Sequence, residues 1–427
     1  MYDLKYINEI EREEFRAVTD RQYFRDGELS VEQVERGVIL PYVKADDGLT
    51  YGGVTDSAGV FLELSRDAEI TGEDFGNYPY AESKDIPYVD EDVIYLGPYK
   101  EQWGHFITST IARLWYVTKN PGDRLKLAYP AGEYSFKAPQ IHGNYLGLLK
   151  LMGFDEDRII RVEEPVRFRR VVLAEPSHVP ETYYTSEYRD FYEDLKSRVR
   201  SEIPVYPKIY LTRLGNEVLD SHDFGEDQLK EIFEKNGFHV LEPSVYSIED
   251  QIRIIGNADV IATVSGSLTH NLVFAREGVE LIVLRRQGYP MLTHLFQGAV
   301  NHMRKARVTH VDTSIRLLPV NGAGPNIFYI SDELISFLKD KGFSYVPEKK
   351  PVESWRRYLV LIWYFLRWLD IHCKQNPLRL KRLEGQFYDS SIRIYGYNRE
   401  KMGWYDEEEG VALRKLFYGI VKKYGRY

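Results

Sequence analysis

The feature that most constrains the fold is a regular alternation of apolar runs and helical segments within residues 208–285. Short runs rich in β-branched residues are typical of buried strands, and four occur here: KIYLTR, FHVLEP, DVIATVS and VELIVLR. The segments between them, 225–237, 247–258 and 268–278, have helical apolar spacing, and Ser247 is suited to cap the second. Strands that alternate with helices predict a parallel sheet covered by helices, a Rossmann-like unit.

A second alternation precedes the first. Apolar runs at 93–98, 125–130 and 171–176 predict strands, and segments 103–119 and 144–153 predict helices between them. Weaker strand signals, GVILPYV and GVFLEL, occur at 37–43 and 59–64, and a polar connector with one helix spans 176–207. We therefore predict an α/β protein of two Rossmann-like domains facing a cleft, followed by a helical extension. The boundaries we expect are 1–185 for the N-terminal domain, 186–330 for the C-terminal domain and 331–427 for the extension.

Composition narrows the functional classes. The 427 residues carry a formal net charge of -9, which argues against general nucleic-acid binding. A single cysteine, Cys373, excludes an intramolecular disulfide and a multi-cysteine zinc site. The chain starts without a signal-peptide pattern and contains no run of ~18 apolar residues. We expect a cytoplasmic protein.

The charge is unevenly distributed. Between residues 356 and 382, seven Lys and Arg side chains accompany one Asp, and Trp355, Trp363 and Trp368 are interleaved with them. Basic and aromatic side chains together favour contact with an anionic lipid surface. We expect residues 355–382 to hold the protein peripherally on the inner face of the plasma membrane. The alternative is a helix packed on the acidic body of the protein.

A strand becomes a helix at Ser265, Gly266 and Ser267. The first amides of a helix lack partners and carry partial positive charge, and small residues let an anion approach them. This turn therefore predicts a phosphate site. The alternative is an ordinary connection in which Ser265 or Ser267 caps the helix.

Arg213 ends the strand at 208–213. Ligands of parallel sheets bind beyond the carboxyl ends of the strands, where a guanidinium can bind a diphosphate through two hydrogen bonds. We expect Arg213 and the serine turn to meet in one crevice. A surface ion pair with Glu217 or Asp220 is the alternative.

Two histidines are candidates for chemistry at this crevice. His105, near the start of the helix at 103–119, is a candidate general base. His270 lies one turn into its helix and suits either a ligand contact or a structural role. Two D-x-D triplets, Asp90–Asp92 and Asp155–Asp157, match a pattern that binds metal in some sugar transferases. They are local pairs without converging oxygens, so we predict no metal site.

Other nucleotide motifs are missing from the sequence. No G-x-G-x-x-G follows the first strand of either unit, and there is no P-loop, so we predict no dinucleotide cofactor.

The series LGPYKEQWGHFITSTIARLW, IYLTR and GEDQLKEIFEKNGFHVLEPSVYSIEDQIRIIGNADVIATVSGSLTHNLVF resembles glycosyltransferase family 61, the DUF563 group, which includes bacterial capsular-polysaccharide transferases. The resemblance covers residues 93–284. It implies a GT-B architecture and inverting transfer from a nucleotide-diphosphate sugar without an essential metal or other cofactor. We expect a UDP-sugar as donor and a glycan or lipid-linked glycan as acceptor.

The resemblance is most specific at Trp103-Gly104-His105, Arg213, Gln251, Ala258 and Leu268-Thr269-His270, and together with the arguments above it gives the expected site residues. His105 is the expected catalytic base, and Trp103 lies on the acceptor side. The expected donor-binding residues are Arg213, Gln251, Ser265, Gly266, Ser267, Leu268, Thr269, His270 and Asn271. The turn departs from the family, because Val264 to Ser267 stand where H-G-A-G or H-G-S-G is usual. Two alternatives therefore stay open: a polysaccharide pyruvyl transferase on a similar scaffold, and a non-catalytic partner of a glycosyltransferase.

Overall fold

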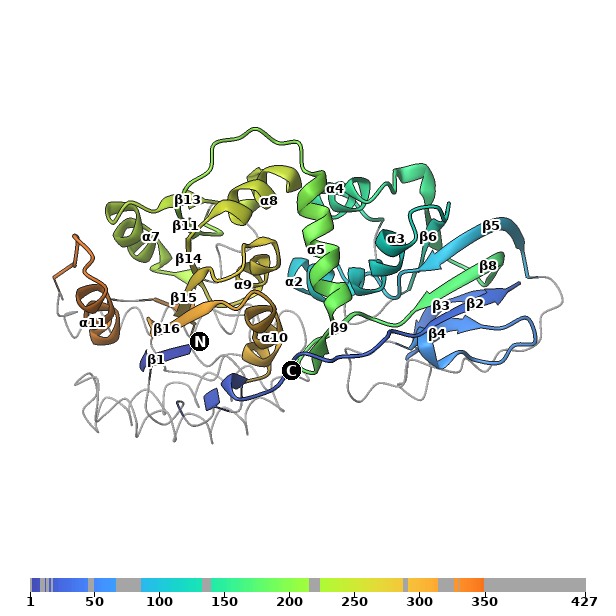
Figure 1. The fold of residues 1–427 in the computed structure, drawn as a ribbon, viewed down its shortest axis with the longest axis horizontal. Coiled ribbons are helices and arrows are strands. Elements are labelled where there is room, and N and C mark those ends of the chain that lie inside the picture. The colour runs from blue at the N-terminus through green and yellow to red at the C-terminus, as the bar shows by residue number, and fades with distance from the viewer. Residues whose placement is uncertain are drawn as a thin grey trace, which may run out of the picture.

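The structure is a computed structural model of the chain. It describes residues 2–348 except 8–11, 13–14, 17, 45–49, 67–85, 133–139, 215–222, 287–290, 314–325 and 329. Within these residues the protein is a mixed α/β structure with two large sheets, and helix α5 (Ser186–Arg198) stands between them (Figure 1). The basic segment 355–382 lies outside the described residues, so peripheral membrane contact stays a prediction.

The first sheet has seven strands in the described part of the chain. They are β2 (Val31–Glu35), β3 (Val38–Lys44), β4 (Thr50–Thr55), β5 (Tyr88–Tyr95), β6 (Lys126–Pro130), β7 (Ile159–Val162) and β8 (Val166–Ala174). Strands β7, β6, β5 and β8 lie side by side and run parallel, whereas β2 and β3 pair antiparallel with β8. When these four parallel strands are numbered by their order in the chain, their order across the sheet is 3-2-1-4. A Rossmann sheet begins with the same order.

The second sheet is parallel throughout, in the order β1-β16-β15-β14-β11-β13. Its strands are β1 (Tyr2–Tyr6), β11 (Lys208–Leu211), β13 (His239–Leu241), β14 (Val260–Val264), β15 (Glu280–Arg285) and β16 (Arg307–Asp312). The order reverses between β11 and β14, because β13 follows β11 on one side and β14 lies on the other. Open α/β sheets bind ligands at such a reversal, beyond the carboxyl ends of the strands.

Helices and short ladders complete the described structure. The remaining α-helices are α2 (Trp103–Thr108), α3 (Trp115–Lys119), α4 (Gly143–Leu151), α7 (Glu226–Lys235), α8 (Ile248–Asn257), α9 (Ser267–His270), α10 (Met291–Met303) and α11 (Asp332–Asp340). The 3-10 helices are η1 (Glu63–Ser65), η2 (Thr110–Arg113), η3 (Glu156–Arg158), η4 (Pro243–Val245) and η5 (Asn271–Phe274). Two-stranded ladders join β9 (His178–Val179) to β10 (Tyr183–Tyr184) and β12 (Asp223–Phe224) to β17 (Asn326–Ile327).

Most predicted elements of both alternations are confirmed. Ser247 caps α8 as expected, because its side chain accepts a hydrogen bond from the Asp250 amide. The expected single helix over 103–119 is wrong, since α2, η2 and α3 divide it. Thr108 Oγ1 donates to the Gly104 carbonyl and Ser109 Oγ donates to the His105 carbonyl. Hydroxyls that bond back in this way compete with the helical ladder.

Two further expectations need correction. The segment 268–278 is not one helix, because the single α-turn of α9 tightens into η5 at Asn271. Asn271 Nδ2 there donates to the carbonyl of Leu268, three residues earlier. The predicted strand 59–64 contributes one bridge at Phe61 and then forms η1.

One hydrophobic cluster extends across both sheets, in addition to separate clusters beside each sheet. A single cluster contains Ile94 and Phe106 from the first half together with Ile209 and Leu272 from the second. The first strand of the chain, β1, joins the second sheet by pairing in parallel with β16. Of the predicted helical extension, α11 is described and packs on the second half through Leu334 and Phe337. The expected domain boundaries stay predictions.

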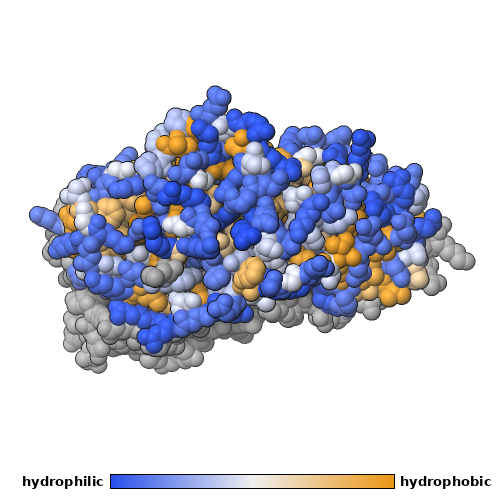
Figure 2. All heavy atoms as spheres, in the orientation of Figure 1, coloured by the Kyte–Doolittle hydropathy of each residue, from blue (hydrophilic) through white to orange (hydrophobic). Residues whose placement is uncertain are grey.

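The surface facing the viewer in Figure 2 is mostly hydrophilic, with hydrophobic residues in separate small patches. Among the described residues, none of the helices combines the length and the apolar character that crossing a membrane requires.

Candidate active site

The carboxyl ends of β11 and β14 place two predicted site segments side by side. Leu211 pairs in register with Thr263, so the residues after both strands emerge at the same edge of the sheet. Arg213 follows β11 there and is half-buried, while Ser265 follows β14. The structure therefore brings Arg213 and the serine turn to one edge, at the reversal of strand order. Glu217 and Asp220, the alternative partners of Arg213, lie outside the described residues.

The serine turn has a defined hydrogen-bonding pattern. The Ser265 amide donates to the Leu284 carbonyl at 2.8 Å, and Ser265 Oγ accepts from the Arg286 amide at 2.9 Å. The Thr269 amide and hydroxyl both donate to the Gly266 carbonyl, at 2.9 and 2.7 Å. Ser265 and Thr269 are thus engaged within the fold. Among the described backbone amides of this turn, those of residues 266–268 remain available to donate hydrogen bonds to an anion.

Gly266 allows this turn. Its φ of 128° and ψ of -158° lie in a region that residues with a Cβ rarely adopt. A glycine is required at this position, and the sequence places one there.

The first turn of α2 packs directly against α9 and joins the two halves of the protein. Trp103 Nε1 donates to Asn271 Oδ1 at 2.8 Å, and Asn271 is completely buried. A Cβ placed on Gly104 would lie 2.6 Å from His270 Cδ2, so only glycine permits this approach. Trp103 also packs edge-to-face on Tyr145. Asn271, an expected donor-binding residue, has its side chain committed to this junction.

Both candidate histidines lie at the same junction. His105 is half-buried, and its ring centroid lies 5.3 Å from that of Phe296. His270 is 6% exposed, and its ring lies 6.4 Å from the same phenylalanine. Burial, and to a smaller extent nearby His105, lower the pKa of His270 to about 4, although the hydrogen bond to Gln297 opposes the shift. His270 is therefore neutral near pH 7.

The side chain of Gln251 bonds to the protein backbone. It is buried on α8, and its Nε2 donates to the Tyr246 carbonyl at 3.1 Å. Asn144 Nδ2 of α4 donates to the same carbonyl at 3.0 Å. These bonds place Gln251 in the packing between α4 and α8. Its expected role in donor binding stays a prediction.

Two residues of the site escaped sequence reasoning. Arg286 is buried, follows β15 and bonds Ser265 through its amide, so a second arginine stands at this edge of the sheet. The available signal was the pair of arginines, Arg285 and Arg286, at the end of the predicted strand 279–285. Gln297 of α10 bonds His270 at 2.7 Å and belongs to no motif.

The acidic triplet Asp90–Asp92 lies within β5 and has partners within the protein. Asp92 accepts hydrogen bonds from Arg169 Nε at 2.7 Å and from Arg170 at 3.0 Å, and Asp90 pairs with Arg169. The neighbouring arginines keep the pKa of Asp92 below its usual value. No cluster of three or more His, Cys, Asp or Glu side chains able to bind a metal occurs among the described residues.

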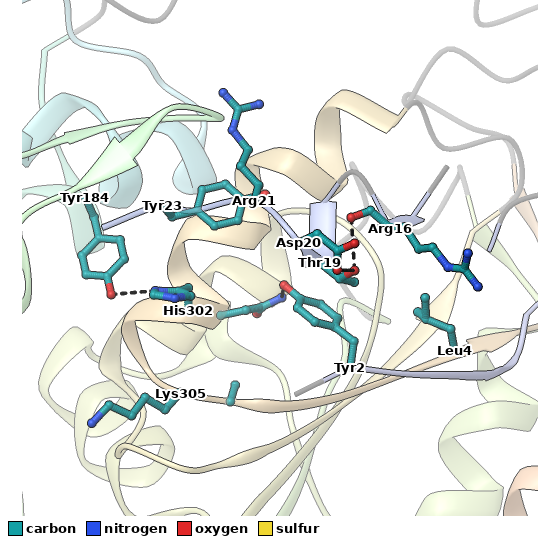
Figure 3. Close-up of a pocket in the computed structure, with 12 residues that line it drawn as sticks. Tyr2, Leu4, Arg16, Thr19, Asp20, Arg21, Tyr23, Tyr184, His302 and Lys305 are labelled. Carbon is teal, nitrogen blue, oxygen red and sulfur yellow. Dashed lines mark hydrogen bonds between the residues drawn. The ribbon is translucent and has the colours of Figure 1, made fainter. Parts of the chain in front are cut away.

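A cavity of about 800 Å³ opens beside the C-terminal end of α10 (Figure 3). Tyr2, Tyr184 and Lys305 are among the residues that line it, and Tyr184 donates to or accepts from His302 Nδ1 at 2.8 Å. The cavity also contacts Asn301, which is one helical turn beyond Gln297.

Comparison with known families assigns the protein to a class. A family model of sugar-transferring enzymes matches residues 103–282, and the chain is a glycosyltransferase. The matching family is Glycosyltransferase 61, so the match supports that family. The match begins at Trp103 and ends within β15, and so includes both segments that meet at the junction. No curated protein matches the chain.

Proposed function

We propose that the enzyme is an inverting, metal-independent glycosyltransferase with a GT-B arrangement. It transfers a sugar from a nucleotide-diphosphate sugar, expected to be a UDP-sugar, to a glycan or lipid-linked glycan acceptor. Synthesis of a capsular or other surface polysaccharide is the process that we propose for it. The observation that carries this proposal is the contact of α2 with α9 and the first residue of η5, beside the Arg213 edge of the second sheet.

The donor diphosphate occupies the reversal of strand order between β11 and β14. The Arg213 guanidinium and the amides of residues 266–268 donate hydrogen bonds to its oxygens. Donors fixed in place stabilise the negative charge that grows on the departing diphosphate, without rearrangement during the reaction. Arg286, at the end of the adjacent strand, adds positive charge to the same edge.

The acceptor binds on the side of Trp103. Its hydroxyl oxygen attacks the anomeric carbon, the bond from that carbon to the diphosphate oxygen breaks, and the diphosphate leaves with the electron pair. His105 takes the proton of the attacking hydroxyl. Attack opposite the leaving group inverts the anomeric configuration. The placement of His105 where both halves meet supports this role.

Nucleotide binding tests the proposal without knowledge of the acceptor. A ligand that binds the native state alone raises its apparent stability by mass action. We expect UDP to raise the thermal unfolding midpoint of the full chain more than GDP, CDP or CMP does, with and without EDTA. A shift that EDTA abolishes would contradict metal independence. The absence of a shift with any nucleoside diphosphate would contradict the proposed donor class.

We further propose a cytoplasmic enzyme that residues 355–382 hold on the inner face of the plasma membrane. The support is the density of basic and aromatic residues in that segment. The full chain should sediment with vesicles containing phosphatidylglycerol at low salt and should be released by high salt. Equal sedimentation with purely zwitterionic vesicles would contradict an electrostatic attraction to anionic lipids. The absence of sedimentation with either kind of vesicle would contradict membrane contact.

A further inference from the structure

A chain of hydrogen-bonded side chains leads away from His270 along α10. His270 Nδ1 lies 2.7 Å from Gln297 Oε1, and Gln297 Nε2 donates to Asn301 Oδ1 at 2.9 Å. Asn301 Nδ2 then donates to the hydroxyl of Tyr2 at 3.1 Å. Gln297 and Asn301 are 5% and 3% exposed, so these bonds form in an environment from which water is largely excluded.

The direction of this chain determines the form of the imidazole. An amide oxygen accepts hydrogen bonds and cannot donate, so the His270 nitrogen that faces it must carry the proton. Each amide nitrogen donates to the next member, Gln297 Nε2 to Asn301 Oδ1 and Asn301 Nδ2 to the Tyr2 hydroxyl, so the hydrogen bonds run in one direction along the chain. Burial raises the pKa of Tyr2 to about 12, so its hydroxyl stays neutral near pH 7. This hydroxyl accepts the last bond from Asn301 Nδ2. A neutral His270 protonated on Nδ1 has a free lone pair on Nε2.

That lone pair faces the junction of the two halves. A Cβ placed on Gly104 would lie 3.4 Å from His270 Nε2 and 3.3 Å from Ser267 Oγ, so both atoms pack closely on the first turn of α2. Within the described residues, Nδ1 is the nitrogen of His270 that is hydrogen bonded. Nε2 is therefore the ring nitrogen left to accept a hydrogen bond at the junction of α2 and α9, beside the place where the donor and acceptor are proposed to meet.

We propose that Gln297 is a positioning residue that holds His270 protonated on Nδ1, so that Nε2 accepts a hydrogen bond from a hydroxyl of the bound nucleotide sugar. The identity of the ligand in this inference rests on the proposed function. The protonation of the imidazole on Nδ1 does not depend on it. Asn301 holds Gln297 in place through a hydrogen bond, and Tyr2 holds Asn301 in the same way. The effect of removing each member should decrease with its distance from His270.

The form of the imidazole can be measured directly. Long-range ¹H–¹⁵N correlation spectra of the full chain labelled in histidine distinguish protonated from unprotonated ring nitrogens, and a His270→Gln variant assigns the signal. We expect Nδ1–H in the wild type and in Gln297→Glu, which keeps an acceptor oxygen. Gln297→Met, which is similar in shape but has no acceptor, should give a mixture of the two forms. A wild-type signal with the proton on Nε2, or an unchanged signal in Gln297→Met, would overturn the proposal.

Kinetics test the contact with the donor. Gln297→Met should raise KM for the nucleotide sugar by about three- to tenfold, the loss of one uncharged hydrogen bond, with a smaller change in kcat. Gln297→Glu should recover most of the loss. Gln228→Met on the exposed side of α7 is the matched control and should change neither constant. A fall in kcat alone would overturn the donor contact. If the wild type transfers no sugar, the proposed function fails while the spectra still decide the role of Gln297.

Discussion

The indole nitrogen of Trp103 donates a 2.8 Å hydrogen bond to the completely buried side-chain oxygen of Asn271, a residue 168 positions later in the chain. This bond joins the first turn of α2 to the segment after β14. Replacing Trp103 by Phe leaves a buried acceptor without a partner, which costs about 1–3 kcal/mol. We expect the free energy of unfolding in urea to fall by that amount and KM for the donor to rise.

Trp115→Phe is the matched control for this prediction. Its indole also donates one hydrogen bond, to the Glu175 carbonyl at 2.8 Å, within the first half of the protein. We expect a similar loss of stability and an unchanged KM for the donor. Equal changes in KM for both variants would show that the Trp103 bond has no special relation to the site.

Gly104 should tolerate no side chain. Gly104→Ala would place a Cβ 2.6 Å from His270 Cδ2, so α2 and α9 must separate or His270 must move. We expect activity to fall by at least an order of magnitude while the far-ultraviolet circular dichroism stays that of the wild type, since steric conflicts in packed regions cost about 1–3 kcal/mol.

Gly122→Ala provides the comparison for Gly104→Ala, because a Cβ there would meet nothing within 4 Å. It should retain full activity and unfold at the wild-type midpoint or slightly above it. Wild-type activity in Gly104→Ala would mean that the close approach of the two helices is unimportant for transfer.

Local patterns explain why much of the fold was predictable. The apolar spacing of 225–258 and the cap at Ser247 depend on residues a few positions apart, and both were found as expected. The pairing of β1 with β16 depends on strands about 300 residues apart and left no local signal. The break of the helix at Ser109 arises from side chains bonding back to the backbone, a choice that apolar spacing does not reveal.

The candidate site shows the same limit. Arg213 and Ser265 each follow a strand, and the carboxyl ends of parallel strands lie at the same edge of a sheet. The sequence was therefore enough to predict that the two residues lie at one edge. The Ser265 amide bonds the Leu284 carbonyl, and the Thr269 amide bonds the Gly266 carbonyl. Only the structure gives the positions of these carbonyls. Gln297 reaches His270 from α10, outside every motif.

Arg213 should contribute strongly to donor binding. Hydrogen bonds to charged groups contribute about 1.5–3 kcal/mol, so Arg213→Ala should weaken UDP binding by about 10- to 100-fold. Arg213→Lys keeps the charge but loses the paired donors and should show an intermediate loss. Isothermal titration calorimetry with UDP measures both.

Arg200→Ala removes an exposed arginine beyond the end of α5 and serves as the charge-matched control. Its affinity for UDP should equal that of the wild type. Unchanged affinity in Arg213→Ala would place the diphosphate elsewhere.

Acid should destabilise the protein through its buried histidines. His178 donates from Nδ1 to the Thr108 carbonyl at 2.6 Å, and burial lowers its pKa to about 3. The unfolded chain takes up this proton near pH 6.5, whereas the folded chain does not, so lowering the pH favours unfolding throughout the interval between the two values. Each such histidine reduces the free energy of unfolding by about 1.4 kcal/mol per pH unit.

His178→Asn keeps a donor for the Thr108 carbonyl but cannot titrate. Urea unfolding of the wild type and of this variant between pH 6.5 and 4.5 should therefore differ in slope by about one proton, with the variant less sensitive to acid. Partners lower the pKa of the Asp92 and Glu187 carboxyls, so their stabilising charge is lost as the pH falls through about 5 and below, equally in the wild type and in the variant. Above pH 7.5 the two curves should run parallel. Identical slopes between pH 6.5 and 4.5 would mean that His178 takes up its proton in the folded protein as readily as in the unfolded chain.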